Sequence, residues 1–171
     1  MNVCDILTAD HANGPGMRIS VFVSGCRNHC AGCFNPETWD FSYGKEYTPF
    51  MTQAIMNELK KPEYQGLTIL GGEPFEPENQ HGLIDLIRSV KQELPKKDIW
   101  MYTGYSYEDL LPDGIRHTDV TDEILDAIDV LVDGRFLLDE KDITLRFRGS
   151  RNQRLIDMKR TRQEGQVVLW T

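Results

Sequence analysis

The chain has 171 residues, of which 40% are hydrophobic and 27% charged, a composition that excludes collagen, a coiled coil and a mostly disordered segment. The net charge of −8 argues against general nucleic-acid binding, and no apolar run approaches the ~18 residues of a membrane span. The first residues show neither a basic patch nor an apolar core. We therefore expect a cytoplasmic protein that binds neither a membrane nor nucleic acid.

The predicted elements alternate between strands and helices. A turn at residues 13–16 precedes the first strand, and Thr48 followed by Pro49 is typical of a helix start. Apolar residues at helical spacing mark a second helix, and short β-branched runs mark the strands. We expect strands at residues 18–23, 67–70, 98–103 and 130–132, and helices from Pro49, over 83–94 and over 121–128. Residues 143–147 and 167–170 are further strand candidates.

This alternation of apolar strands and helices predicts an α/β fold with a parallel sheet and crossover helices. A closed eight-fold barrel takes ~250 residues, so we expect one domain over residues 1–171 that is a partial, open barrel or a doubly wound sheet. In both folds the C-terminal ends of the strands carry the chemistry. Four loops follow these ends and are expected at one rim: the loop with three cysteines, residues 71–74, Gly104 and residues 133–134.

Three of the four cysteines lie within eight residues as C-x3-C-x2-C: Cys26, Cys30 and Cys33. Three thiolates on a [4Fe–4S] cluster leave one iron open to a small chelating ligand. A structural zinc usually takes four ligands in two separated pairs, and Cys4 has no paired neighbour. A dithiol redox pair of Cys30 and Cys33 leaves Cys26 unexplained. We therefore place the cluster ahead of zinc, and zinc ahead of the dithiol.

Two motifs resemble the radical S-adenosylmethionine superfamily: the cysteine motif followed by Phe34, and the Gly-Gly-Glu-Pro sequence at 71–74. The segments 13–18, 23–26, 33–39, 102–105, 132–136 and 148–154 narrow the resemblance to activating proteins of the anaerobic (class III) ribonucleoside-triphosphate reductase. It covers the chain from about Asn13 to Arg154. It implies a partial, open (β/α) barrel of radical-SAM type with a mostly parallel sheet and a core over about 13–154. The basic C-terminal segment and tail at 141–171 overlap the end of this core.

The resemblance also implies a reaction. A reduced [4Fe–4S] cluster cleaves S-adenosylmethionine, and the resulting 5′-deoxyadenosyl radical removes hydrogen from a glycine of the reductase to leave a glycyl radical. The implied partners are the glycyl-radical subunit of that reductase and a low-potential electron donor such as flavodoxin.

Residue roles follow from the same resemblance. It makes Cys26, Cys30 and Cys33 the iron ligands and assigns no catalytic residue beyond the cluster. A turn, a core aromatic or a strand end remains an alternative for several of the other positions. The residues expected to bind S-adenosylmethionine are Gly32, Cys33, Phe34, Gly71, Gly72, Glu73, Thr103 and Asp133.

Three other functions stay open: activation of a different glycyl-radical enzyme, radical chemistry on a small molecule (as in a deazaguanine synthase), and a non-catalytic iron–sulfur or zinc module. Reductive cleavage of S-adenosylmethionine would separate the enzymes from the module.

Charge is unevenly distributed. Residues 141–162 hold eight basic and two acidic side chains, which makes this segment +6 and the remainder −14. Such asymmetry predicts a local anionic partner, with a solvated basic face as the alternative.

Overall fold

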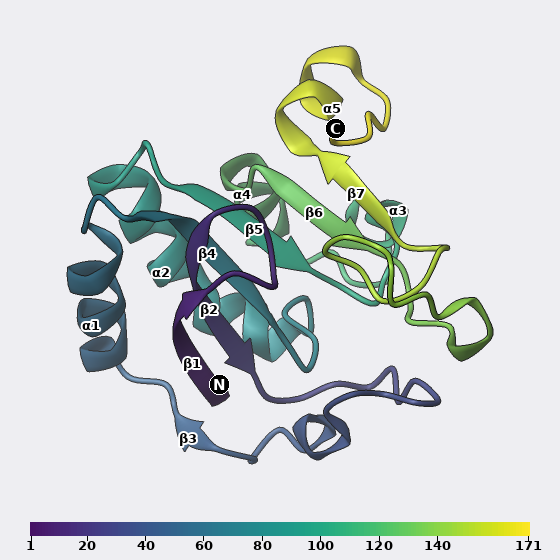
Figure 1. Ribbon diagram of the computed structural model, residues 1–171, viewed down its shortest axis with the longest axis horizontal. Coiled ribbons are helices and arrows are strands. Elements are labelled where there is room, and N and C mark those ends of the chain that lie inside the picture. The colour runs from purple at the N-terminus through teal and green to yellow at the C-terminus, as the bar shows by residue number, and fades with distance from the viewer.

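The computed structural model describes all 171 residues and contains one seven-stranded mixed sheet with the strand order β3-β1-β2-β4-β5-β6-β7 (Figure 1). The strands are β1 (Asn2–Asp10), β2 (Met17–Val23), β3 (Lys45–Glu46), β4 (Tyr64–Gly71), β5 (Asp98–Tyr102), β6 (Val130–Asp133) and β7 (Arg154–Asp157). The α-helices are α1 (Pro49–Leu59), α2 (Pro77–Glu93), α3 (Tyr107–Leu110), α4 (Thr121–Ala127) and α5 (Met158–Glu164), with 3-10 turns η1 (Pro36–Trp39) and η2 (Leu138–Glu140).

The four central strands β2, β4, β5 and β6 are parallel and adjacent in chain order. The predicted strands and the α/β class are thereby confirmed for the middle of the sheet. Its edges differ from the prediction, because β1 and β3 on one side and β7 on the other pair antiparallel. Strands β1 and β2 are joined by a short turn, and no α-helix lies between β6 and β7, so neither pair has the helical crossover that usually joins parallel neighbours.

Side chains along the central strands alternate between two buried faces. Val21, Ile69 and Met101 face the main core, which the helices α1, α2 and α4 complete. On the other face, Trp100 belongs to a smaller cluster with Phe147 and other residues from the C-terminal part of the chain. Because both faces are covered, the strands are apolar at most positions.

Helix α2 is the longest helix, and it begins six residues before the predicted segment. Pro77 occupies its first turn, where a missing N–H costs nothing. Leu83, Leu86, Ile87 and Val90 are completely buried, and each contributes about 1.5–3 kcal/mol of apolar burial. This helix therefore fixes the position of the loop between β4 and its own first turn.

Two predicted strands do not form. Residues 143–147 adopt turns and bends, and Phe147 has φ of 63°, a left-handed conformation that a strand cannot contain. Residues 167–170 contribute only one isolated bridge, between Leu169 and Ile156. The connection from β6 to β7 is instead a long loop pinned by a bridge between Lys141 and Ser150. None of the helices is both long and apolar enough to cross a membrane.

Candidate functional site

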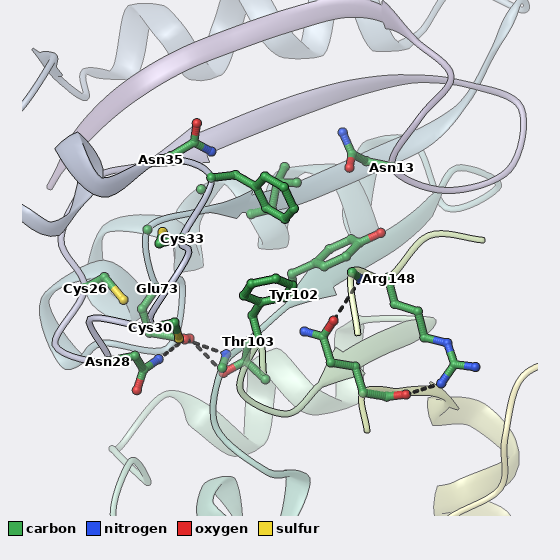
Figure 2. Close-up of a pocket in the computed structure, with 18 of the residues that line it drawn as sticks. Asn13, Cys26, Asn28, Cys30, Cys33, Asn35, Glu73, Tyr102, Thr103 and Arg148 are labelled. Atoms are coloured by element: carbon green, nitrogen blue, oxygen red, sulfur yellow. Dashed lines mark hydrogen bonds between the residues drawn. The ribbon is translucent and has the colours of Figure 1, made fainter. Parts of the chain in front are cut away.

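A cavity of about 580 Å³ lies at the C-terminal ends of the four parallel strands, within the range of ~300–1,000 Å³ typical of small-molecule sites. The loops after β2, β4, β5 and β6 all contribute to its lining, as their place in the predicted fold required. Figure 2 shows the three clustered cysteines and Glu73 on one side of this cavity, and Tyr102 and Arg148 on the other.

The loop with the three cysteines (residues 24–35, the cysteine loop) is shaped by hydrogen bonds and by unusual backbone angles. Gly25 has φ of +102°, and a Cβ there would lie 2.3 Å from the ring of Phe41. The backbone N–H of Gly25 donates to the carbonyl of Thr38 (2.7 Å). His29 is also left-handed (φ 47°), and its ring stacks on Trp39 at 4.3 Å. His29 is thus held against an aromatic ring between the cysteines.

All four cysteines are free thiols. Burial raises the pKa of the Cys26 thiol to about 11 and also raises the pKa of Cys30. Without a metal, these side chains therefore stay protonated at neutral pH. A metal centre that binds thiolates would displace these protons, which couples metal binding to proton release.

No group of three His, Cys, Asp or Glu side chains is arranged to hold a single metal ion. This geometry does not fit a structural zinc, which draws its ligands to one point. A cubane cluster binds each thiolate through a different iron, so its ligands need not converge. Three free cysteines on one cavity wall therefore fit a [4Fe–4S] cluster.

The Gly-Gly-Glu-Pro loop after β4 packs directly on the cysteine loop. The backbone N–H of Gly72 donates to Val23 (2.7 Å), and that of Glu73 donates to Gly25 (2.8 Å). A Cβ on Gly72 would lie 2.7 Å from the carbonyl oxygen of Gly25, closer than such atoms approach. Gly71 has φ of +120°, which only glycine adopts without strain. Both glycines are thus required by the approach of the two loops.

Glu73 is completely buried and joins three loops of the site. Its carboxylate accepts hydrogen bonds from Thr103 Oγ1 (2.7 Å), Gly104 N (2.7 Å), Phe75 N (2.9 Å) and Asn28 Nδ2 (3.1 Å). Burial raises its pKa to about 7, although these donors oppose the rise. Its role in this structure is to fix the loops after β4 and β5 against the cysteine loop.

The structure brings most of the predicted site residues to the cavity. Gly32 and Asp133 do not line it. Gly32 faces the side chain of Leu138, and Asp133 pairs with Arg154 (2.5 Å) and accepts from the N–H of Tyr107 (2.8 Å). The predicted residues that line the cavity are Cys26, Cys30, Cys33, Phe34, Gly71, Gly72, Glu73 and Thr103.

Several residues that sequence reasoning missed also shape the site. The side chain of Asn79 in α2 donates to the carbonyls of Ser24 (3.0 Å) and Glu73 (2.9 Å). Its only signal in the sequence is an amide on the buried side of an amphipathic helix. Arg148 belongs to the segment 148–154 that carries the resemblance, but the sequence did not place it in the site; it lines the cavity and donates to the carbonyl of Arg151 (3.1 Å).

The cavity also has aromatic walls. Phe34 and Phe136 pack at 5.3 Å and, with Tyr102, give apolar walls for a planar base. Trp39 also lines the cavity, and its buried indole N–H has no hydrogen-bond partner in the protein.

Comparisons with known proteins identify a domain family and relatives of this chain. The family model described as "4Fe-4S single cluster domain" matches residues 12–156. An anaerobic ribonucleoside-triphosphate reductase-activating protein of Vibrio cholerae serotype O1 is 41% identical over 155 residues, which cover 90% of this chain and 96% of the relative. Proteins with the same name from Escherichia coli K12 and Enterobacteria phage T4 are each 39% identical, over 90% and 91% of this chain and 96% and 93% of the relatives.

Proposed function

This chain belongs to the family of anaerobic ribonucleoside-triphosphate reductase-activating proteins and carries a 4Fe-4S single cluster domain, and from this we propose that it is a radical S-adenosylmethionine enzyme. Its substrates would be S-adenosylmethionine and a glycine of the anaerobic reductase, which would become a glycyl radical. The partner would be the glycyl-radical subunit of that reductase.

Cys26, Cys30 and Cys33 would hold a [4Fe–4S] cluster, and the methionine part of S-adenosylmethionine would bind the open iron. The bound cluster supplies one low-potential electron for reductive cleavage of S-adenosylmethionine, the reaction that generates the hydrogen-abstracting radical. A one-electron donor of low potential, such as flavodoxin, would deliver that electron.

The chain's own residues bind, orient and exclude water. Gly71 and Gly72 bring backbone carbonyls to the cavity, where they are suited to accept from the ligand's ammonium group. Glu73 holds this loop in register with Thr103, whose strand end lies at the same rim. Phe34 and Phe136, whose rings pack together, would cover the bound ligand and keep water from the reacting atoms.

Gly32 and Asp133 have a different part in this proposal. Gly32 lets the cysteine loop turn beside Leu138, and Asp133 fixes the start of the loop after β6 through Arg154. The sequential parallel strands with their helices on one face support a partial, open barrel of radical-SAM type. We treat residues 1–171 as one such domain.

The observation that carries the proposal is the meeting of three free cysteines and the Gly-Gly-Glu loop on one cavity. The test is anaerobic reconstitution with iron and sulfide, reduction, and addition of S-adenosylmethionine. We expect about four irons per chain, release of methionine and 5′-deoxyadenosine, and a glycyl radical signal in electron paramagnetic resonance once the reductase is added. Cleavage without a radical on the reductase would point to a different substrate, and a cluster without cleavage would point to a non-catalytic module.

A further inference from the structure

Arg135 lies over the cysteine loop without a carboxylate partner. It follows β6, and its Nη2 donates to Asn28 Oδ1 (3.4 Å), between Cys26 and Cys30 in the chain. No carboxylate lies within 4.0 Å of its guanidinium, whereas Arg27 in the cysteine loop pairs with Glu76 (2.7 Å) and Glu78 (2.8 Å). The charge of Arg135 is therefore not neutralised by a neighbouring side chain.

The backbone that carries Arg135 is held firmly in place. Gly134 N donates to the carbonyl of Tyr105 (2.9 Å), and Gln153 Nε2 donates to the carbonyl of Gly134 (3.0 Å). Asn152 Nδ2 donates to the carbonyl of Arg135 itself (2.7 Å). The loop after β6 thus presents this side chain from a fixed position.

The same loop acts on Cys30. The backbone N–H of Phe136 donates to the Cys30 sulfur, and the guanidinium of Arg135 in the same loop lies near enough to act on that sulfur electrostatically. Arg135 therefore interacts electrostatically with Cys30, about one hundred positions earlier in the sequence. The charge of Arg135 and the N–H of Phe136 both favour negative charge on the Cys30 sulfur.

We propose that Arg135 tunes the reduction potential of the cluster held by the cysteine loop, by stabilising the negative charge that the incoming electron adds. This inference rests on the proposed cluster and goes beyond it by naming the residue that sets how easily the cluster is reduced. The balance is one electron from a low-potential donor to the oxidised cluster, which gains one negative charge. A nearby cation lowers the free energy of the reduced form more than that of the oxidised form, so it raises the potential.

The size of the expected shift in reduction potential depends on where the Arg135 side chain lies. The side chain is exposed, so water and salt screen part of its effect. At a fixed ambient potential we expect Arg135→Gln to lower the ratio of reduced to oxidised cluster about three- to tenfold, where tenfold corresponds to 59 mV for one electron.

The experiment is a redox titration of the reconstituted full-length protein, followed by electron paramagnetic resonance and without S-adenosylmethionine. Arg135→Gln should shift the midpoint to lower potential. Arg135→Lys, which keeps the charge, should stay within about twofold of the wild-type ratio. Arg151→Gln is the matched control, because it removes the same charge from the same loop and Arg151 is not among the main influences on Cys26 or Cys30.

Arg135→His gives a second measurement within one folded protein. Its imidazole loses its charge between about pH 5 and 8, so its midpoint should fall more with pH in that range than the midpoint of the wild type. An unchanged midpoint in Arg135→Gln with a full cluster would overturn the proposal, as would an equal fall in Arg135→Lys. Equal pH dependence of Arg135→His and wild type would overturn it too, even if Arg135→Gln assembled no cluster. Absence of a [4Fe–4S] signal in the wild type would instead refute the proposed function.

Discussion

The three clustered cysteines are chemically unequal before any metal binds. Cys26 is 8% exposed, and its pKa is raised to about 11 by burial, whereas Cys30 and Cys33 are partly exposed at the cavity. Cys4 lies in β1 and does not line the cavity. The three cysteines that are close in the sequence therefore share one wall of the cavity, and Cys4 lies outside it.

We predict that Cys26→Ala, Cys30→Ala and Cys33→Ala each lose the cluster, while Cys4→Ala retains it. Removing one thiolate leaves an iron without its protein ligand, and the other two cannot hold a stable cubane. Iron and sulfide analysis with visible absorbance of the anaerobically reconstituted variants measures this. A Cys4→Ala protein without iron would refute the three-ligand arrangement.

Glu73 predicts a pH dependence of the apo protein's stability. Its folded pKa of about 7 lies above the ordinary value of 4.5, so the protonated form is favoured on folding. The stabilisation is complete below pH ~4.5 and is lost as pH rises through 7, by an amount on the order of 3 kcal/mol. Chemical denaturation of wild type and Glu73→Gln between pH 5 and 8 compares the two slopes.

The test depends on how steeply the unfolding free energy changes with pH, and the difference in stability at any single pH does not decide it. Glu73→Gln places an amide opposite the N–H donors of Phe75 and Gly104, which lowers stability at every pH. His81 also has a raised pKa, through Asp119, but it is present in both proteins. Identical slopes in wild type and variant would show that Glu73 does not titrate in this range.

At the scale of elements, hydrophobic periodicity predicted the four parallel strands and the helices between them. It succeeded where one face or both faces are buried, as in residues 67–70 of β4, all of which are buried. The same logic placed the strand ends at one rim, because parallel strands share a direction. The cavity lining could therefore be anticipated in outline from the order of motifs along the chain.

The remaining elements depend on tertiary contacts that sequence patterns do not carry. Strand β1 is polar at several positions and exists because it pairs with β2. The segment 143–147 has strand-like composition, but hydrogen bonds such as Asp142 N to Gly149 O (3.1 Å) close it into a loop. Arg135 and Asn28 are in contact although they lie 107 positions apart in the sequence. Helix and strand periodicity describes only neighbouring residues, so it cannot predict such a contact.

Helix α2 supplies the next prediction, because one of its side chains hydrogen-bonds to both the cysteine loop and the Gly-Gly-Glu-Pro loop. Asn79 is 1% exposed, and its Nδ2 donates to both the cysteine loop and the Gly-Gly-Glu-Pro loop. Asn79→Asp replaces this donor with an acceptor that faces the carbonyls of Ser24 and Glu73. We expect a loss of about 2 kcal/mol or more in unfolding free energy and weaker binding of S-adenosylmethionine.

Thermal unfolding of the apo protein and calorimetry of the reconstituted protein measure the two effects. Asn57→Asp is the matched control, since it makes the same chemical change at an exposed position of α1. Wild-type stability and affinity in Asn79→Asp would remove this residue from the support of the site.

At the scale of the whole molecule, the basic segment contains two kinds of arginine. Some bond to carboxylates or carbonyls of the protein, and others form no ion pair. Arg154 is committed to Asp133 and Glu108, and Arg162 donates to the carbonyl of Leu125 (2.8 Å). Arg146 and Arg151 are exposed, do not line the cavity and form no ion pair with a carboxylate. They lie in the loop between β6 and β7, other residues of which line the cavity, and the exposed Ile143 belongs to the same loop. A docking surface for an acidic partner is therefore expected there rather than on Arg154.

The last prediction tests this docking surface through salt. The double variant Arg146→Glu and Arg151→Glu should slow association with the reductase about tenfold at low salt, because like charges then oppose the encounter. The difference should vanish near 1 M salt, where the Debye length is ~3 Å. Lys60→Glu with Lys96→Glu is the control, since these exposed lysines precede β4 and β5 at the opposite rim. Surface-binding kinetics and cleavage of S-adenosylmethionine without the reductase are measured together. Unchanged association in the double variant would refute the docking surface, and a collapse of cleavage alone would assign these arginines to the cofactor site.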